Sequence, residues 1–178
     1  MTMEINVKDE MVMKLLHYFI TEKNYNPVVL HGAQDEIWLE NMDNEYKIVR
    51  IVSNYIHNNE QLDFDLFKTK RIVNNIKKKT FNFNMNVLSI YVDLDFNKNN
   101  TITCVNINNE KDINKYEVFK NYFTDIKNKL VFNEDGMELF MKITSDIAKK
   151  NQEESEKAES IFKPKTPYIT YILIAINV

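Results

Sequence analysis

Hydrophobic residues recur along the chain with two different periods, and these periods predict its helices and strands. Apolar residues three and four positions apart predict a first helix after Asp9, with an apolar face over 12–19, and further helices at about 65–79, 116–130 and 137–148. Short runs rich in β-branched and aromatic residues predict strands at 27–30, 36–40, 46–52, 87–92 and 101–107. The order α-β-β-β-α-β-β-α-α predicts a single α/β (α+β) domain in which helices flank a mixed β-sheet.

Composition narrows the classes of function. The 178 residues, 44% of them hydrophobic, are enough for one domain with a core of its own. The formal charge of −3 disfavours a dedicated nucleic-acid binder, so we expect no nucleic-acid partner. The single Cys104 excludes an intramolecular disulfide and a cysteine-based zinc site, and Gly32 and Gly136 are too few for a glycine-rich phosphate loop. No catalytic motif is visible, so no catalytic residue is assigned.

The chain changes character after residue 148. Residues 151–160 are almost wholly polar and predict either a solvated helix extension or a linker. Residues 163–167, Lys-Pro-Lys-Thr-Pro, end this stretch, and residues 168–178 are the most hydrophobic in the sequence. We therefore divide the chain into a globular domain at 1–148, a charged linker at 149–166 and an apolar segment at 167–178.

Two interpretations of the apolar segment stay open, a last buried strand or the first half of a transmembrane helix. A complete span needs about 20 apolar residues. Lys163 and Lys165 precede the segment as expected of a cytosolic flank, and Tyr168 and Tyr171 suit the headgroup level, so the setting favours the membrane. Residues 1–14 lack the apolar core of a signal peptide. We expect a cell-membrane protein whose globular domain lies in the cytoplasm.

The order of several motifs resembles a known family. Asp35-Glu36-Ile37-Trp38-Leu39-Glu40, then Ile-Val-Arg-Ile at 48–51 and Val-Leu-Ser-Ile-Tyr-Val at 87–92, precede a Glu/Lys-rich linker and the run PKTPYITYILIAIN at 164–177. This resembles the N-terminal cytosolic region of Gram-positive rhomboid-family intramembrane serine proteases, over essentially the whole chain. The resemblance implies an accessory or regulatory domain that recruits membrane-protein substrates or adaptor proteins, or senses a divalent cation.

The same resemblance implies that this segment is not catalytic. Rhomboids cleave substrates with a Ser–His dyad on later transmembrane helices, where the serine lies in a Gly-x-Ser-Gly motif. Gly32 is followed by Ala33 and Gln34, and Gly136 by Met137 and Glu138, so neither glycine belongs to such a motif. The parent protein would be a serine-type endopeptidase whose catalytic residues lie downstream.

Five carboxylates are candidates for a Mg²⁺ or Mn²⁺ site, although no cofactor is required. Asp35, Glu36 and Glu40 lie on or beside one predicted strand, and Glu45-Tyr46-Lys47 opens the next. This arrangement, with the order α-β-β-β-α-β, is similar to metal-dependent nucleases of the restriction-endonuclease-like group. The alternative function is therefore a soluble metal-dependent nuclease-like enzyme, although we favour such a fold without activity.

Asp63 and Asp65, near the start of the helix predicted at 65–79, are the other two candidates. We favour helix capping and charge–dipole stabilisation for this pair. Trp38, the only tryptophan, is predicted to pack in the core. The same helix has a basic side, which is typical of a solvated face but near a membrane could contact anionic headgroups. Its members are Lys68, Lys70, Arg71, Lys77, Lys78 and Lys79.

Overall fold

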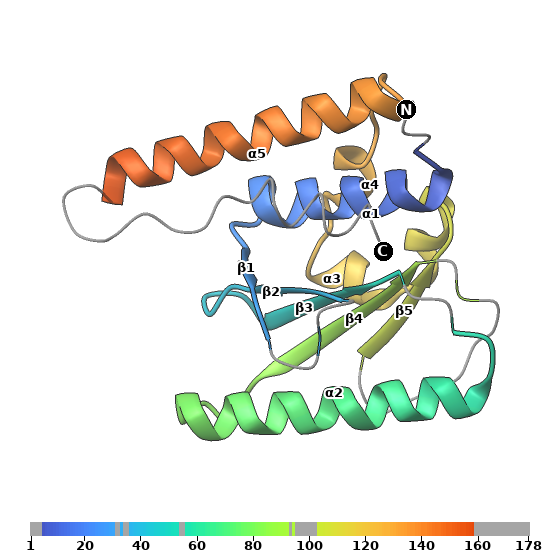
Figure 1. The fold of residues 1–178 in the computed structure, drawn as a ribbon, viewed down its shortest axis with the longest axis vertical. Coiled ribbons are helices and arrows are strands. Elements are labelled where there is room, and N and C mark those ends of the chain that lie inside the picture. Colours follow the sequence, from blue (N-terminus) through green and yellow to red (C-terminus); the bar gives the residue numbers. More distant parts are fainter. Residues whose placement is uncertain are drawn as a thin grey trace.

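A five-stranded mixed sheet with helices on both faces forms the fold in the computed structural model (Figure 1). The structure describes residues 5–30, 33, 36–53, 56–92, 94 and 103–158. Strands β1 to β3 are antiparallel neighbours, and β3, β4 and β5 are parallel. The predicted α/β fold with a mixed sheet is confirmed. In spatial order the strands are β1 (Asn26–Val28), β2 (Ile37–Glu40), β3 (Tyr46–Val52), β4 (Asn86–Val92) and β5 (Thr103–Ile107).

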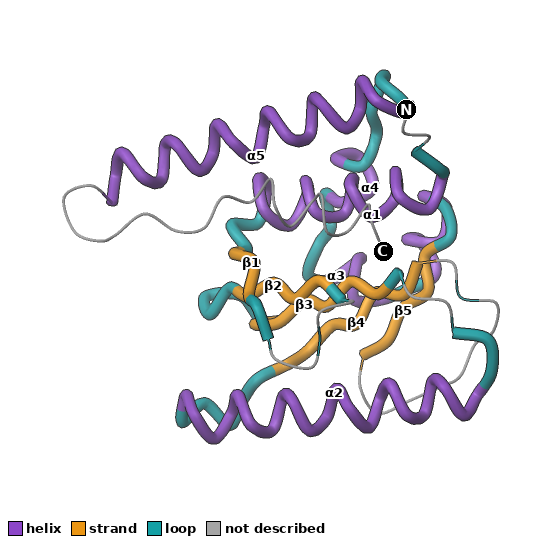
Figure 2. The backbone as a smooth tube through the Cα atoms, viewed as in Figure 1, coloured by secondary structure: helices purple, strands orange, loops and turns teal. Residues whose placement is uncertain are grey.

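The described helices form two layers, one on each face of the sheet (Figure 2). On one face lies α2 (Asn59–Thr80), which connects β3 to β4 and so allows these two strands to run parallel. The other helices belong to the opposite layer. They are α1 (Val7–His17) with its π-helical continuation Tyr18–Glu22, the 3₁₀ helix Glu110–Lys115, α3 (Glu117–Asn121), α4 (Ile126–Lys129) and α5 (Gly136–Ala158).

Side chains alternate between the two faces along the central strands and so build two different cores. Val49 and Ile51 of β3 belong to a continuous apolar cluster beneath α1 and α5. Ile48 and Val52 point the other way and belong to two separate, smaller clusters beneath α2. Trp38 is buried in the first of these smaller clusters, as predicted.

Helix boundaries differ from the prediction in the first two helices. The first helix begins before the start predicted after Asp9, and Asn6 caps it, because the Asn6 side-chain oxygen accepts a hydrogen bond of 2.9 Å from the Asp9 backbone N–H. The second helix begins at Asn59 with Asn58 as its cap, well before the predicted start. Asp63 and Asp65 therefore lie inside α2, and the prediction that they cap it is wrong.

The helix predicted at 116–130 is two short helices, α3 and α4, with a break at 122–125. Its apolar side chains still reach the core, since Phe119, Phe123 and Leu130 are all buried. At the break, the Asp125 carboxylate accepts a hydrogen bond of 2.6 Å from the Tyr18 hydroxyl and pairs with Lys23 at 3.0 Å. These tertiary contacts favour the break over a continuous helix.

The last helix, α5, packs on α1 and continues beyond it (Figure 1). Its first part is held in the core by the buried side chains of Leu139, Ile143 and Ile147. The helix then continues through residues 149–158, so this part of the predicted linker is a helix extension. Within the part of the chain that the structure describes, no helix is long and apolar enough to cross a membrane. The rest of the predicted linker, 159–166, and the predicted membrane segment at 167–178 lie outside the described residues.

Candidate functional site: a buried ion cluster

A buried charged side chain lies between the sheet and α2. The side chain of Arg50, on β3, has no solvent exposure. Its Nε donates a hydrogen bond of 2.6 Å to Oε2 of Glu36, and its Nη2 donates to Oδ1 of Asp65 on α2. Because an unpaired buried charge is strongly unfavourable, these two carboxylates are what allow an arginine in the core.

Four further side chains surround the three charges. Lys68 Nζ donates to Glu36 Oε1, and Trp38 Nε1 donates to Glu36 Oε2 at 2.9 Å. The Tyr91 hydroxyl donates to Asp65 Oδ2 at 2.7 Å and accepts from Arg50 Nη1 at 3.2 Å. Ser89 Oγ lies 3.5 Å from the same Nη1. We call this set the Arg50 cluster: Glu36, Trp38, Arg50, Asp65, Lys68, Ser89 and Tyr91.

The Arg50 cluster is balanced in charge and closed in hydrogen bonding. Two carboxylates face two cations, and each carboxylate oxygen accepts at least one hydrogen bond. Among the described residues, no buried side-chain nitrogen or oxygen is left without a partner. The members of the cluster come from β2, β3, β4, α2 and the segment just before β2. The cluster therefore links these elements through buried hydrogen bonds and ion pairs.

The electrostatics hold three members of the Arg50 cluster, Glu36, Arg50 and Tyr91, in fixed protonation states. Burial by itself would raise the pKa of Glu36, but hydrogen bonds and charges from Arg50 and Lys68 outweigh it and lower the pKa to about 2. Burial would lower the pKa of Arg50, yet Glu36 and Asp65 raise it above its usual range. Burial raises the pKa of the Tyr91 hydroxyl well above its usual range. At neutral pH Glu36 is thus ionised, Arg50 charged and Tyr91 protonated.

The cysteine next to the cluster is not set up as a nucleophile. Cys104 lies on β5 beside Tyr91, and burial raises the pKa of its thiol to about 11. The thiolate is the reactive form of cysteine, so a protonated thiol is a weak nucleophile at neutral pH.

The structure brings together two of the five predicted metal candidates. Glu36 and Asp65 both bind Arg50, whose guanidinium lies between them where a metal ion would have to bind. Asp63 is exposed on α2, Glu40 lies at the other end of β2, and Asp35 is outside the described residues. Within the described ranges, no three His, Cys, Asp or Glu side chains come together as a group that could hold a metal ion.

The strand register separates the nuclease-like motif from Glu36. Ile37 pairs with Ile51 and Glu40 with Ile48, so Glu36 adjoins the far end of β3 while Glu45 and Lys47 adjoin the β2–β3 turn. There the Glu45 carboxylate accepts a hydrogen bond of 2.7 Å from the Asn86 side chain, and Lys47 Nζ donates to the Asn44 carbonyl at 3.3 Å. Of the carboxylates on or beside β2, Glu36 therefore lies away from Glu45-Tyr46-Lys47, whereas Glu40, which pairs with Ile48, lies near it.

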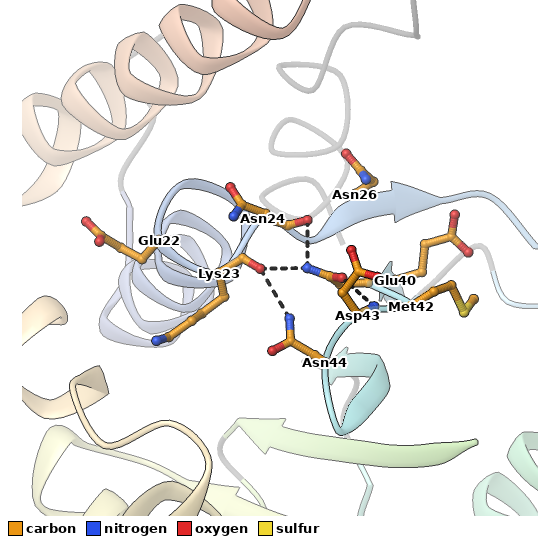
Figure 3. A pocket seen from close by; sticks show the side chains of 9 residues that line it. Glu22, Lys23, Asn24, Asn26, Glu40, Met42, Asp43 and Asn44 are labelled. Atoms are coloured by element: carbon orange, nitrogen blue, oxygen red, sulfur yellow. Dashed lines mark hydrogen bonds between the residues drawn. The ribbon is translucent and has the colours of Figure 1, made fainter. Parts of the chain in front are cut away.

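Glu40 belongs instead to an open, polar hollow of about 580 Å³ beside the β2–β3 turn (Figure 3). The Asn41 side-chain amide holds the turn against the end of the first helix by donating to the backbone carbonyls of Lys23, at 2.9 Å, and Asn24, at 3.2 Å. The amides of the hollow are thus used to join two segments of the chain. The hollow is lined by Glu22, Lys23, Asn24, Asn26, Glu40, Asn41, Met42, Asp43 and Asn44.

Sequence reasoning missed the centre of the cluster, although a signal was present. Arg50 is the only charged residue in the apolar run 48–52, and the chain holds just two arginines. An arginine inside a strand predicted to be buried requires acidic partners, and Glu36 and Asp65 were already candidates for a different role. Tyr91 gave no such signal, because tyrosine is ordinary in a strand.

Comparison of the sequence with protein families and with curated proteins adds no relative to this picture. No family model matches the sequence, and no curated protein matches it. The fold and the site therefore define a mixed α/β domain with a closed internal ion cluster, and function has to be inferred from these features and the sequence.

Proposed function

We propose that the chain is the N-terminal cytosolic accessory domain of a rhomboid-like intramembrane serine protease, where it recruits membrane-protein substrates or adaptor proteins. The observation that carries this proposal is the state of Glu36 and Asp65. Both carboxylates are bound by Arg50 and lie next to Lys68, so they serve the fold and are not available for metal-dependent chemistry. This state of the two carboxylates supports a role in binding over metal-dependent cleavage.

The course of α5 supports the membrane part of the proposal. This helix is anchored in the core by Leu139, Ile143 and Ile147, and its last turns run beyond α1 (Figure 1). In sequence it leads toward Lys163 and Lys165 and the apolar segment at 167–178. A helical arm of this type would carry the domain at a short distance from the bilayer, with the Ser–His dyad downstream.

Sensing of Mg²⁺ or Mn²⁺ is the second role that the resemblance offers for the same domain. It needs ligands from residues outside the described ranges, or release of Glu36 from Arg50. Recruitment needs neither change, and we therefore place it first.

The test compares the whole protein with a form that lacks residues 1–158, both in membranes. We expect both forms to cleave a generic transmembrane substrate, while the truncated form loses cleavage of the cell's own substrates, measured by quantitative proteomics of membrane fractions. A whole protein without proteolytic activity would contradict the proposal.

The nuclease-like alternative is tested in parallel on the purified chain. We expect no cleavage of plasmid DNA with Mg²⁺ or Mn²⁺. Metal-dependent cleavage that Glu36→Gln, Glu40→Gln or Asp65→Asn abolishes would establish the alternative and overturn the proposed function.

A further inference from the structure

The outward face of α2 exposes aromatic side chains that the packing of the domain does not use. Phe64 is 69% exposed and Phe67 60%. Just after the helix, Phe81 is 84% exposed and Phe83 69%. Single exposed apolar residues are common, but here two phenylalanines lie near the start of one helix and two lie just after its end, so exposed rings flank the same element at both ends.

The helical spacing aligns the aromatic residues with cations. Phe64, Phe67, Arg71 and Lys78 follow at intervals of three, four and seven, so they share one line along α2. The opposite line holds Leu62, Leu66, Thr69 and Val73, which are buried toward the sheet. The exposed line therefore lies as far from the sheet as the helix allows, and α2 forms the outermost layer on its side of the domain (Figure 2).

Phe81 is an unfavourable choice for the fold itself. It follows α2 in the left-handed region, with φ 53° and ψ 22°. Glycine or asparagine is the usual residue at this position, because a Cβ atom makes the left-handed conformation unfavourable. An aromatic residue that is both strained and exposed is better explained by a contact outside the domain.

Toward the C-terminal end of α2 the charge around these rings has a single sign, whereas Glu60 and Asp63 are exposed beside Phe64 near the start of the helix. Residues 66–92 contain six Lys or Arg and no Asp or Glu, although the whole chain has a formal charge of −3. One of the six, Lys68, belongs to the Arg50 cluster. Within the described part of the chain, the other five, Lys70, Arg71, Lys77, Lys78 and Lys79, form no ion pair, whereas many cations elsewhere do.

We propose that this α2 face, composed of Phe64, Phe67, Lys70, Arg71, Lys78 and Phe81, rests on the surface of an anionic lipid bilayer. The rings enter the boundary between headgroups and acyl chains, and the cations bind lipid phosphates. Charge complementarity selects this occupant, because an apolar protein surface would cover the rings and leave the cations unpaired. In Figure 1 the C-terminal ends of α2 and α5 both lie at the left, on opposite faces of the sheet.

This inference rests on the proposed function in one respect, that the domain lies near a membrane. The test measures membrane contact by α2 separately from membrane binding by residues 167–178. In the full chain, Phe67→Trp places a fluorophore on the α2 face, while the native Trp38 is buried and serves as an internal reference. The control variant Met141→Trp places the same fluorophore at a position on α5 that is 65% exposed. Each variant is mixed with vesicles of brominated phosphatidylglycerol or brominated phosphatidylcholine, in which bromine quenches tryptophan that enters the bilayer.

We expect phosphatidylglycerol vesicles to quench the emission from position 67 about twofold and to leave position 141 unchanged. Lys70→Gln/Arg71→Gln/Lys78→Gln in the Phe67→Trp background should remove the quenching, as should about 1 M salt, which screens charges beyond roughly 3 Å. Equal quenching at 67 and 141, or no quenching at 67, would overturn the proposal. So would equal quenching in phosphatidylcholine, or a concentration-dependent blue shift without vesicles, which would indicate pairing of two chains.

Binding of the tail is scored separately by cosedimentation with the same vesicles. If the chain sediments but position 67 is not quenched, the α2 inference fails while attachment through segment 167–178 stands. If position 67 is quenched but a chain without residues 167–178 binds equally well, the α2 inference stands and the membrane part of the proposed function loses its support.

Discussion

The two faces of the sheet are stabilised in different ways. Beneath α1 and α5, the core is one continuous apolar cluster that includes Leu16, Val49 and Ile143. Beneath α2, Arg50 and its partners lie between two smaller apolar clusters. The free energy gained by apolar burial is proportional to the area buried, and many packing arrangements provide it. A buried arginine, in contrast, is tolerated only when particular hydrogen-bond acceptors lie within reach. The α2 face therefore depends on a few specific contacts, and the α1–α5 face on the sum of many.

This difference bears on how α2 is positioned. Asp65 from the helix, Glu36 from the segment before β2 and Tyr91 from β4 all bind one side chain of β3. A shift of α2 along the sheet would leave a buried charge unpaired, so the Arg50 cluster favours one placement of the helix. The same placement presents Phe64 and Phe67 outward.

Breaking the Arg50 cluster should have the largest effect. Arg50→Met leaves Glu36 and Asp65 buried with too little positive charge, and we expect the free energy of unfolding at pH 7 to fall by about 3–5 kcal/mol, measured by urea denaturation. The loss should shrink toward pH 4, because Glu36 without Arg50 loses the interaction that lowers its pKa and can take up a proton. The variant Glu36→Gln/Arg50→Met/Asp65→Asn removes the charges together and should recover part of the stability. If Arg50→Met left the free energy of unfolding unchanged, the Arg50 cluster would not be what holds α2 on the sheet.

A matched change on the apolar face should be similar in size but different in pH dependence. Leu16 is fully buried on α1, so Leu16→Ala removes apolar contacts and leaves a cavity. We expect a loss of about 2–5 kcal/mol. The loss should be the same at pH 7 and pH 4, because no titrating group is involved. A pH-dependent loss would remove the contrast between the two faces.

Acid should weaken the α2 face through Glu36. The ordinary pKa of this carboxyl is 4.5 and the folded value is about 2, so the unfolded chain binds more protons between these values. The stabilisation is complete above pH 4.5 and is lost as the pH falls toward 2, by about 3 kcal/mol. Thermal melts from pH 6 to 2 should show a flatter acid decline for Glu36→Gln. Glu40 lies at the other end of β2, outside the Arg50 cluster. The variant Glu40→Gln should therefore retain the full acid decline in stability.

The smallest predicted effect has the opposite sign. Phe81→Gly relieves the left-handed backbone after α2, and we expect stability to rise by about 1 kcal/mol. The same change should weaken binding to phosphatidylglycerol vesicles. Phe83→Gly, which removes a ring without a positive φ, should not stabilise the domain; a gain of the same size there would mean that strain at Phe81 is not the cause.

The sequence predicted the element types well and the interruptions poorly. The strand at 46–52 and the order of the elements are as expected, because β-branched runs and helical spacing are local signals. The break at 122–125 was missed, since the residues on both sides keep a helical period and only the contacts of Asp125 with Tyr18 and Lys23 interrupt it. Similarly, the sequence indicated Glu36 and Asp65 as candidate ligands of a cation. The predicted cation was a metal ion, whereas the structure shows that it is the guanidinium of Arg50.

The sequence by itself determined the α/β fold and which strand faces are apolar, because the two periods of hydrophobic residues are properties of neighbouring positions. Only the tertiary structure decided that Arg50 lies between Glu36 and Asp65, because these residues are 14 and 15 positions away along the chain and meet across three different segments. A charged residue in a buried strand indicates that an oppositely charged partner is required. Which residue becomes that partner depends on how α2 packs on the sheet.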